Sequence, residues 1–235
     1  ASFAAILMFA SLMALGRFLF CNPKRYWVLG SFGIINIAIL YTQTRQAWLG
    51  VFIGIICILF FWNKKYISLI PLLCVFLLLF APSNIQNRML SLTSFQDTGL
   101  QERISTWKGG WEIFKDHPVT GCGYKCVDFV YSQYPDPSGK IALYRGMHNN
   151  FVQLLVDTGI VGLSLWISIW VAYFIEFFKR WKTLAEDKSQ DNARGILIGS
   201  LASVHAYVVA GCFESSIYDS EVSMLLFFLM GLSLA

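Results

Sequence analysis

The sequence predicts an all-α membrane protein, a polytopic helix bundle with about seven transmembrane helices and one large outer loop. Of its 235 residues, 56% are hydrophobic and only 14% are charged. The mean hydropathy of +0.57 is too high for a soluble domain of this size. Apolar windows close to the length that crosses a bilayer, roughly 20 helical residues, recur along the chain. They lie at about 3–20, 27–44, 46–62, 66–81, 160–178, 195–212 and 221–235.

The polar residues divide the chain into three parts. We expect residues 1–81 to form a first transmembrane helix group, residues 82–159 a long loop with short amphipathic helices, and residues 160–235 a second group. The stretch from Ala1 to Phe20 begins without Met and has no basic region before its apolar residues. We therefore expect a helix entered partway, in a fragment of a longer protein, and not a signal peptide.

The positions of Lys and Arg predict the orientation in the membrane. Basic residues gather in alternate short connections, at Lys24 and Arg25, at Lys64 and Lys65, and over residues 179–194. The positive-inside rule assigns these connections to the cytoplasm. The long loop, the junction that holds Arg45 and the acidic turn at 214–221 then all lie on the outer side.

Within the long loop, the spacing of apolar residues predicts an amphipathic helix of about sixteen residues. Leu100, Ile104, Trp107, Trp111 and Phe114 recur at intervals of three and four, and the helix should end near Asp116, since Pro118 cannot continue it. The two tryptophans favour a position along the membrane interface. Packing against the outer ends of the spans is an equal alternative.

A second helix should begin next to His148. Apolar residues continue at helical spacing from Asn149, but a straight helix from there to Lys179 would be about 46 Å long, longer than the bilayer is thick. We therefore expect a break near Gly159. This places His148 at the start of a short outer helix.

Arg45 stands between two apolar runs. An arginine at bilayer depth costs about 2.5–3.5 kcal/mol on insertion scales, so an anion should match it. One interpretation is an arginine that reaches lipid headgroups; the other is a phosphate site shared with Arg103 and Arg145, because guanidinium groups bind phosphate bidentately.

The cysteines and carboxylates give little sign of a metal. Cys122 and Cys126 share the outer loop, where an oxidising compartment would permit a disulfide. Two thiols with no second pair and no nearby histidine make a weak zinc signal. The sequence also contains no Asp-x-Asp pair, so we expect no metal-dependent transferase.

An ordered set of short motifs resembles the O-antigen ligase and O-antigen polymerase superfamily over about residues 35–170. Each motif is short, but their order and their common membrane face make the set specific. The motifs are Thr42-Gln43-Thr44-Arg45 before an apolar helix, Glu102-Arg103 with Asp116-His117-Pro118 and Gly121-Cys122-Gly123, and His148-Asn149 with Gly159-Ile160-Val161-Gly162.

The resemblance implies a glycosyltransferase of the bacterial inner membrane, multi-pass, with its active site facing the periplasm. Such enzymes take a glycan from undecaprenyl diphosphate and are thought to work without a metal or other cofactor. By position, Arg45, Arg103 and His148 match the catalytic residues of the family. Glu214 matches more loosely an acidic or polar residue at the outer end of a late span.

The chemistry of these residues agrees with that expectation. Fixed arginines would stabilise the departing diphosphate, and His148 could accept the proton of an acceptor hydroxyl, although a histidine at a helix start is also a common surface residue. The acceptor is a lipid A core sugar, a growing O-antigen chain or a protein. Further candidates for substrate binding are Arg145, Glu214, Asn149, Trp107 and Tyr144; the aromatic faces would stack on sugars or anchor the loop.

A transporter or flippase of lipid-linked sugars is the competing class of protein. It would also need arginines for the diphosphate, but it should show paired repeats and polar residues at the bilayer midplane. Here the polar clusters gather at one membrane boundary, which favours the enzyme.

Overall fold

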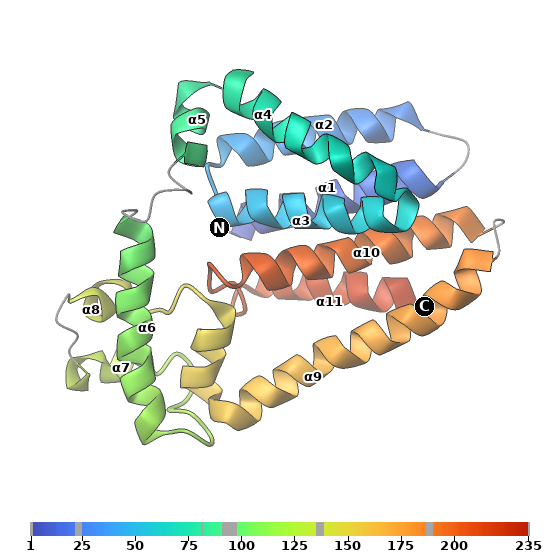
Figure 1. The fold of residues 1–235 in the computed structure, drawn as a ribbon. Helices are drawn as coiled ribbons and strands as arrows, with labels where there is room; N and C mark the ends of the chain where they lie inside the picture. Colours follow the sequence, from blue (N-terminus) through green and yellow to red (C-terminus); the bar gives the residue numbers. More distant parts are fainter. Residues whose placement is uncertain are drawn as a thin grey trace. The chain divides into compact units, whose positions relative to one another are not determined.

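The computed structural model describes residues 2–21, 25–80, 82–90, 98–134, 139–186 and 190–234, and these residues form helices and turns without any strand (Figure 1). Lys24, the expected span ends at Ala81 and Ala235, and residues 187–189 lie outside the described residues. The helices are α1 (Ser2–Phe20), α2 (Tyr26–Tyr41), α3 (Arg45–Trp62), η1 (Lys64–Leu69), α4 (Ile70–Phe80), α5 (Ser83–Leu90), α6 (Thr98–Asp116), α7 (Val127–Val130), η3 (Tyr131–Gln133), α8 (Lys140–Tyr144), α9 (Asn150–Glu186), α10 (Asp191–Ala210) and α11 (Ser220–Leu234).

Four described helices are long and apolar enough to cross a membrane: Ser2–Phe20, Arg45–Trp62, Asn150–Leu184 and Asp191–Ala210. The all-helical class is confirmed, whereas the full count of about seven spans is not reached by this criterion. Helices α2 and α11 are apolar but shorter. The window at 66–81 divides into a 3₁₀ segment and the 11-residue α4. Pro71 lies in the first turn of α4, where proline is tolerated because the amide it lacks would have no partner within the helix.

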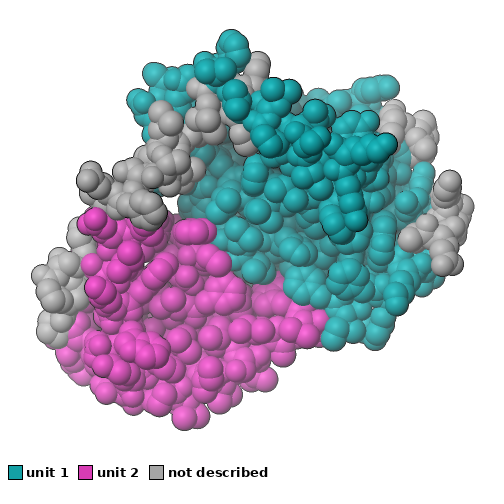
Figure 2. Space-filling model, viewed as in Figure 1, with its two compact units in different colours: residues 1–91, 173–210, 218–235 teal, residues 92–172, 211–217 magenta. Residues whose placement is uncertain are grey.

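The chain folds into two compact units, each described by itself (Figure 2). Unit 1 comprises residues 1–91, 173–210 and 218–235, and unit 2 comprises residues 92–172 and 211–217. Helix α9 contributes to both, since its residues up to 172 belong to unit 2 and its residues from 173 belong to unit 1.

In unit 1, glycines allow α1 and α10 to pack at close range. A Cβ atom added to Gly16 would lie 2.9 Å from the Gly195 carbonyl oxygen and 3.0 Å from the Gly199 Cα. Small residues at such contacts are the usual means by which membrane helices associate, since lipid offers no hydrophobic driving force between them. In α2, by contrast, an added Cβ at Gly33 would have no atom of the described residues within 4 Å.

The later part of α9 packs into unit 1 through aromatic rings. Phe177 is fully buried, and the ring of Phe61 on α3 lies 5.6 Å from Phe177 and 5.1 Å from Trp181, both nearly edge to face. Perpendicular rings at these separations attract each other beyond the area they bury. This packing fixes the end of α9 against α3.

In unit 2, α6 spans Thr98–Asp116 and ends where the proline was expected to end it. Ile104 and Trp111 of the predicted apolar stripe are 41% and 53% exposed, whereas Ile113, which lies outside that stripe, is fully buried. Gly109 and Gly110 lie on the buried side, where added Cβ atoms would meet Ile141 and Met147 side chains. A small core gathers beside α6; its buried members are Ile113, Cys126, Val127, Ile141, Met147 and Val156.

The predicted break in α9 is confirmed at Gly159, which has φ 64° and ψ −166°. We call residues 118–123 the glycine loop. The amides of Ile160 and Val161 donate to carbonyls of the glycine loop at 2.9 and 3.3 Å, and the loop's Cys122 and Gly123 amides donate to Val156 and Asp157 carbonyls. The loop thus satisfies the backbone groups that a broken helix leaves open.

Only glycine fits on either side of this contact. An added Cβ at Gly159 would lie 2.3 Å from the Val119 carbonyl oxygen, and one at Gly121 would lie 2.3 Å from the Asp157 carbonyl carbon. Both residues also have positive φ, which favours glycine.

Candidate functional site

His148 is fixed in unit 2 by the residue that follows it. The Asn149 side-chain oxygen accepts hydrogen bonds from the amides of Phe151 and Val152 at 2.9 and 3.1 Å, so Asn149 caps the first turn of α9. Its Nδ2 donates to the Cys212 carbonyl at 2.9 Å, and its backbone amide donates to Ser215 Oγ at 3.0 Å. These bonds tie the start of α9 to the turn at 211–217.

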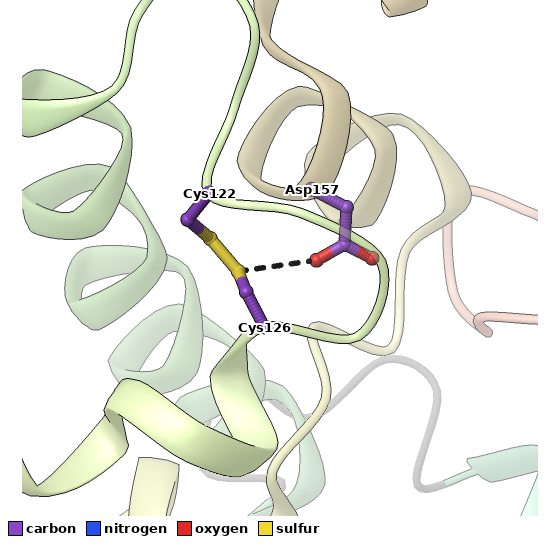
Figure 3. Close-up of side chains that lie close together, drawn as sticks. All are labelled: Cys122, Cys126 and Asp157. Carbon is purple, nitrogen blue, oxygen red and sulfur yellow. Dashed lines mark hydrogen bonds between the residues drawn. A yellow bond between two sulfur atoms is a disulfide. The ribbon is translucent and has the colours of Figure 1, made fainter.

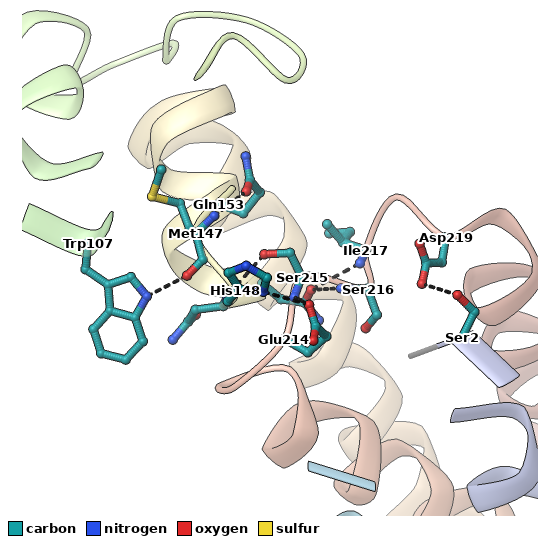
Figure 4. A network of polar contacts seen from close by, with 12 residues as sticks. Ser2, Trp107, Met147, His148, Gln153, Glu214, Ser215, Ser216, Ile217 and Asp219 are labelled. Carbon is teal, nitrogen blue, oxygen red and sulfur yellow. Dashed lines mark hydrogen bonds and ion pairs between the residues drawn. The ribbon is translucent and has the colours of Figure 1, made fainter. Parts of the chain in front are cut away.

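That turn brings Glu214 to His148 (Figure 4). Nδ1 of His148 lies 3.1 Å from Oε1 of Glu214, and the two side chains are 36% and 22% exposed. The Ser215 amide donates to the same carboxylate oxygen at 3.1 Å. The sequence placed Glu214 on the outer side, but only the fold shows that it pairs with His148.

The surroundings of Glu214 keep its carboxylate charged. Burial raises its pKa, but the hydrogen bond and charge of His148, the Ser215 amide and the charge of Arg103 together lower the pKa below its ordinary value. With this carboxylate as acceptor, a neutral His148 donates from Nδ1, and the lone pair stands on Nε2. The pair therefore has the arrangement of a general base whose ring is oriented by a carboxylate.

Arg103 and Tyr144 also belong to this cluster. Arg103 lies on α6 and acts on Glu214 through its charge. The Tyr144 hydroxyl donates to Glu102 Oε2 at 2.8 Å, and its ring stands edge to face with the His148 imidazole, 5.6 Å between centroids. A phenol ring, an imidazole and a carboxylate thus meet in unit 2, within range of the charge of Arg103.

Trp107 and Arg145, two further predicted residues, have contacts of their own. The Trp107 indole donates to the Met147 carbonyl at 2.6 Å. The Arg145 guanidinium lies 4.6 Å from the centre of the Tyr131 ring, and its Nε donates to the Ala142 carbonyl at 3.4 Å. Trp107 therefore contacts the segment of His148 directly, whereas Arg145 contacts α8 and η3.

Arg45 is the first residue of α3 and belongs to unit 1. The expected tight junction before it is present: α2 ends at Tyr41, and the Thr44 amide donates to Thr42 Oγ1 at 3.3 Å. Convergence of Arg45 with Arg103 and His148 stays a prediction.

Cys122 and Cys126 form a disulfide, which the shared loop had suggested (Figure 3). Their Cα atoms are 5.7 Å apart, an ordinary separation for such a bridge. Sγ of Cys126 lies 3.5 Å from Oδ1 of the buried Asp157. These three residues are also the group of potential metal ligands found among the described residues, but sulfurs joined to each other do not ligate as thiolates.

Sequence reasoning missed Gln153 and Asp157, two buried polar residues one turn apart on α9. The signal was present, since a glutamine and an aspartate four residues apart within an apolar helix can bond to each other. It also missed Ser215, whose hydroxyl oxygen accepts a hydrogen bond from the backbone amide of Asn149.

These features define a helical, multi-pass membrane protein with a histidine–carboxylate pair beside an arginine. Comparison with known families agrees. A family model for O-antigen ligases matches residues 29–167, more than half of the 235 residues. The chain therefore belongs to the O-antigen ligase family and is a membrane glycosyltransferase of that enzyme family. The match includes Arg45, Arg103 and His148 but ends before Glu214. No curated protein matches the chain.

Proposed function

We propose that this protein transfers a glycan from undecaprenyl diphosphate to a hydroxyl acceptor at the periplasmic face of the inner membrane. Membership of the O-antigen ligase family supports the transfer of lipid-linked glycans. The observation that carries the assignment of roles is the pairing of His148 with Glu214 at 3.1 Å, on whose carboxylate the charge of Arg103 also acts.

In the proposed reaction His148 is the general base. Its Nε2 takes the proton of the acceptor hydroxyl while the oxygen attacks the anomeric carbon of the donor. The bond from that carbon to the diphosphate oxygen breaks, and the electron pair leaves with the lipid diphosphate. Glu214 stabilises the imidazolium that forms. Direct displacement of this kind inverts the configuration at the anomeric carbon.

Arg103 and Arg45 bind the diphosphate in this proposal. The negative charge on the leaving group grows as the bond breaks, so cations fixed near it favour the transition state over the ground state. Guanidinium groups suit this role because they bind phosphate oxygens bidentately. Arg103 is supported by its charge effect on Glu214, and Arg45 by its place in the family motif at the start of α3.

Tyr144, Trp107, Arg145 and Asn149 complete the proposed site. Tyr144, which is 39% exposed, offers a ring face for a sugar beside the base. Trp107 and Asn149 act through the segment that carries His148. The acceptor belongs to one of three classes: a lipid A core sugar, the growing O-antigen chain or a protein hydroxyl.

The proposed topology has about seven spans. Residues 1–81 and 160–235 form the two helix groups, and residues 82–159 form the periplasmic loop. The support is the alternation of basic connections, which assigns that loop to the outer side.

Transfer by the full-length protein tests the function. Protein in liposomes would receive a purified undecaprenyl diphosphate-linked glycan and each acceptor class, with glycan product measured over time. We expect His148→Ala and Arg103→Ala to abolish most transfer, while His117→Ala, an exposed histidine at the end of α6, keeps the normal rate. Normal transfer by His148→Ala and Arg103→Ala would contradict the assignment. Movement of the donor across the bilayer without transfer would favour a flippase.

A further inference from the structure

The backbone that presents His148 is strained. His148 has φ 46° and Arg145 has φ 48°, in the left-handed region that residues other than glycine seldom adopt. Such a conformation persists only where neighbouring groups hold it. Neighbouring groups must therefore hold the segment from Met147 to Asn149.

Both polar backbone groups of Met147 are bound by side chains (Figure 4). Its amide donates to Oε1 of Gln153 at 3.0 Å, and its carbonyl accepts from the Trp107 indole at 2.6 Å. The Met147 side chain is fully buried in the unit 2 core. The residue directly before His148 is thus fixed at its amide, its carbonyl and its side chain.

Gln153 is itself oriented by a second buried residue. Its Nε2 donates to Oδ2 of Asp157 at 2.9 Å, and the two residues are 3% and 1% exposed. Because the carboxylate oxygen accepts, the amide nitrogen must face Asp157, and Oε1 is left to face Met147. A buried chain of bonds therefore runs from Asp157 through Gln153 to the Met147 amide.

We propose that Gln153 and Asp157 are positioning residues for His148. The chain of bonds fixes the Met147 amide, which holds the strained His148 backbone and keeps the imidazole in bonding distance of Glu214. This inference rests on the proposed function of His148 as the base. Neither residue touches substrate in this scheme, since both act through the backbone before His148.

Three variants test the chain of bonds. Gln153→Met removes both bonds at similar volume. Gln153→Glu places a second carboxylate against Asp157 and should lower kcat by up to about 10²-fold, the loss typical of a small misplacement of a reacting group, with the donor KM unchanged. The double variant Gln153→Glu with Asp157→Asn restores a bridge of reversed polarity, in which the new amide donates to the new carboxylate and the latter accepts the Met147 amide. It should recover most of kcat.

Gln133→Glu is the matched control, since it makes the same chemical change at an exposed position of unit 2 and should leave kcat unchanged. Rates are taken per mole of folded protein, and the ring nitrogen signals of His148 are followed by NMR in detergent. Loss of the Nδ1–H signature in Gln153→Glu and its return in the double variant support positioning. A merely structural role lowers the unfolding temperature without altering that signature or kcat.

The two hypotheses fail differently. If Gln153→Met keeps full kcat and an unchanged His148 signal while His148→Ala is inactive, the positioning role is overturned and the proposed function stands. Normal transfer by His148→Ala overturns the proposed function, and the ring signals in the Gln153 variants then still decide whether this chain of bonds orders His148.

Discussion

Glu214→Gln is the most direct test of how the histidine–carboxylate pair works. The substitution keeps the size of the side chain and an oxygen that can accept from Nδ1 of His148, but it removes the negative charge 3.1 Å from the ring. In the proposed reaction that charge stabilises the imidazolium that forms as the acceptor loses its proton. The variant should therefore lower kcat more than it changes the KM for the donor.

The size of the effect follows from the geometry. A hydrogen bond to a charged group contributes about 1.5–3 kcal/mol, and each 1.36 kcal/mol corresponds to roughly tenfold in rate. Since the His148 and Glu214 side chains are 36% and 22% exposed, water competes for the pair and the lower part of the range applies. We expect kcat to fall roughly 10- to 30-fold.

The assay is transfer of a lipid-linked glycan in liposomes at saturating donor and acceptor. Glu112→Gln is the control, because Glu112 pairs with Lys115 on an exposed face of α6 and such pairs contribute little. A kcat for Glu214→Gln equal to that of the wild type would refute the role of the charge. A raised donor KM with unchanged kcat would instead place Glu214 in donor binding.

Three further predictions concern stability, each measured by thermal unfolding in detergent. Folding lowers the pKa of Glu214 below 4.5. The pairing of Glu214 with His148 therefore stabilises the protein above about pH 4.5, and this stabilisation is lost as the pH falls through the lowered pKa. Acidification below about pH 4.5 should lower the unfolding temperature of the wild type more than that of Glu214→Gln. Gly16→Ala should destabilise by about 1–3 kcal/mol through overpacking against α10, and Gly33→Ala, in open space, should not; equal effects would contradict the close packing. Gly159→Ala should cost roughly 2–5 kcal/mol, from backbone strain plus the clash with the glycine loop. Gly139 has φ 66° but no atom of a described residue within 4 Å of an added Cβ, so Gly139→Ala should show the strain alone.

Local patterns predicted the elements whose causes are local. Pro118 explains the end of α6, and the length of the apolar run after Asn149 explains the break at Gly159. The tight junction before Arg45 follows from two apolar runs with almost no polar residues between them. In each case, a few neighbouring residues determine the outcome.

Contacts between distant residues were beyond such patterns. Glu214 and His148 are separated by 66 positions, and nothing around Glu214 marks its partner. The buried face of α6 was not predicted, because Gly109 and Gly110 give no apolar signal, although their lack of side chains is what admits Ile141 and Met147. A contact that depends on a missing side chain can be recognised only when the positions of both the glycine and the residue that packs on it are known.

The Cys122–Cys126 disulfide has a practical consequence for handling this enzyme. The bridge lies beside Asp157 at the contact between the glycine loop and α9, so its formation belongs to the assembly of the unit that carries His148. Recombinant protein is best produced in a host whose export machinery oxidises thiols, and purified without dithiothreitol or phosphine reductants.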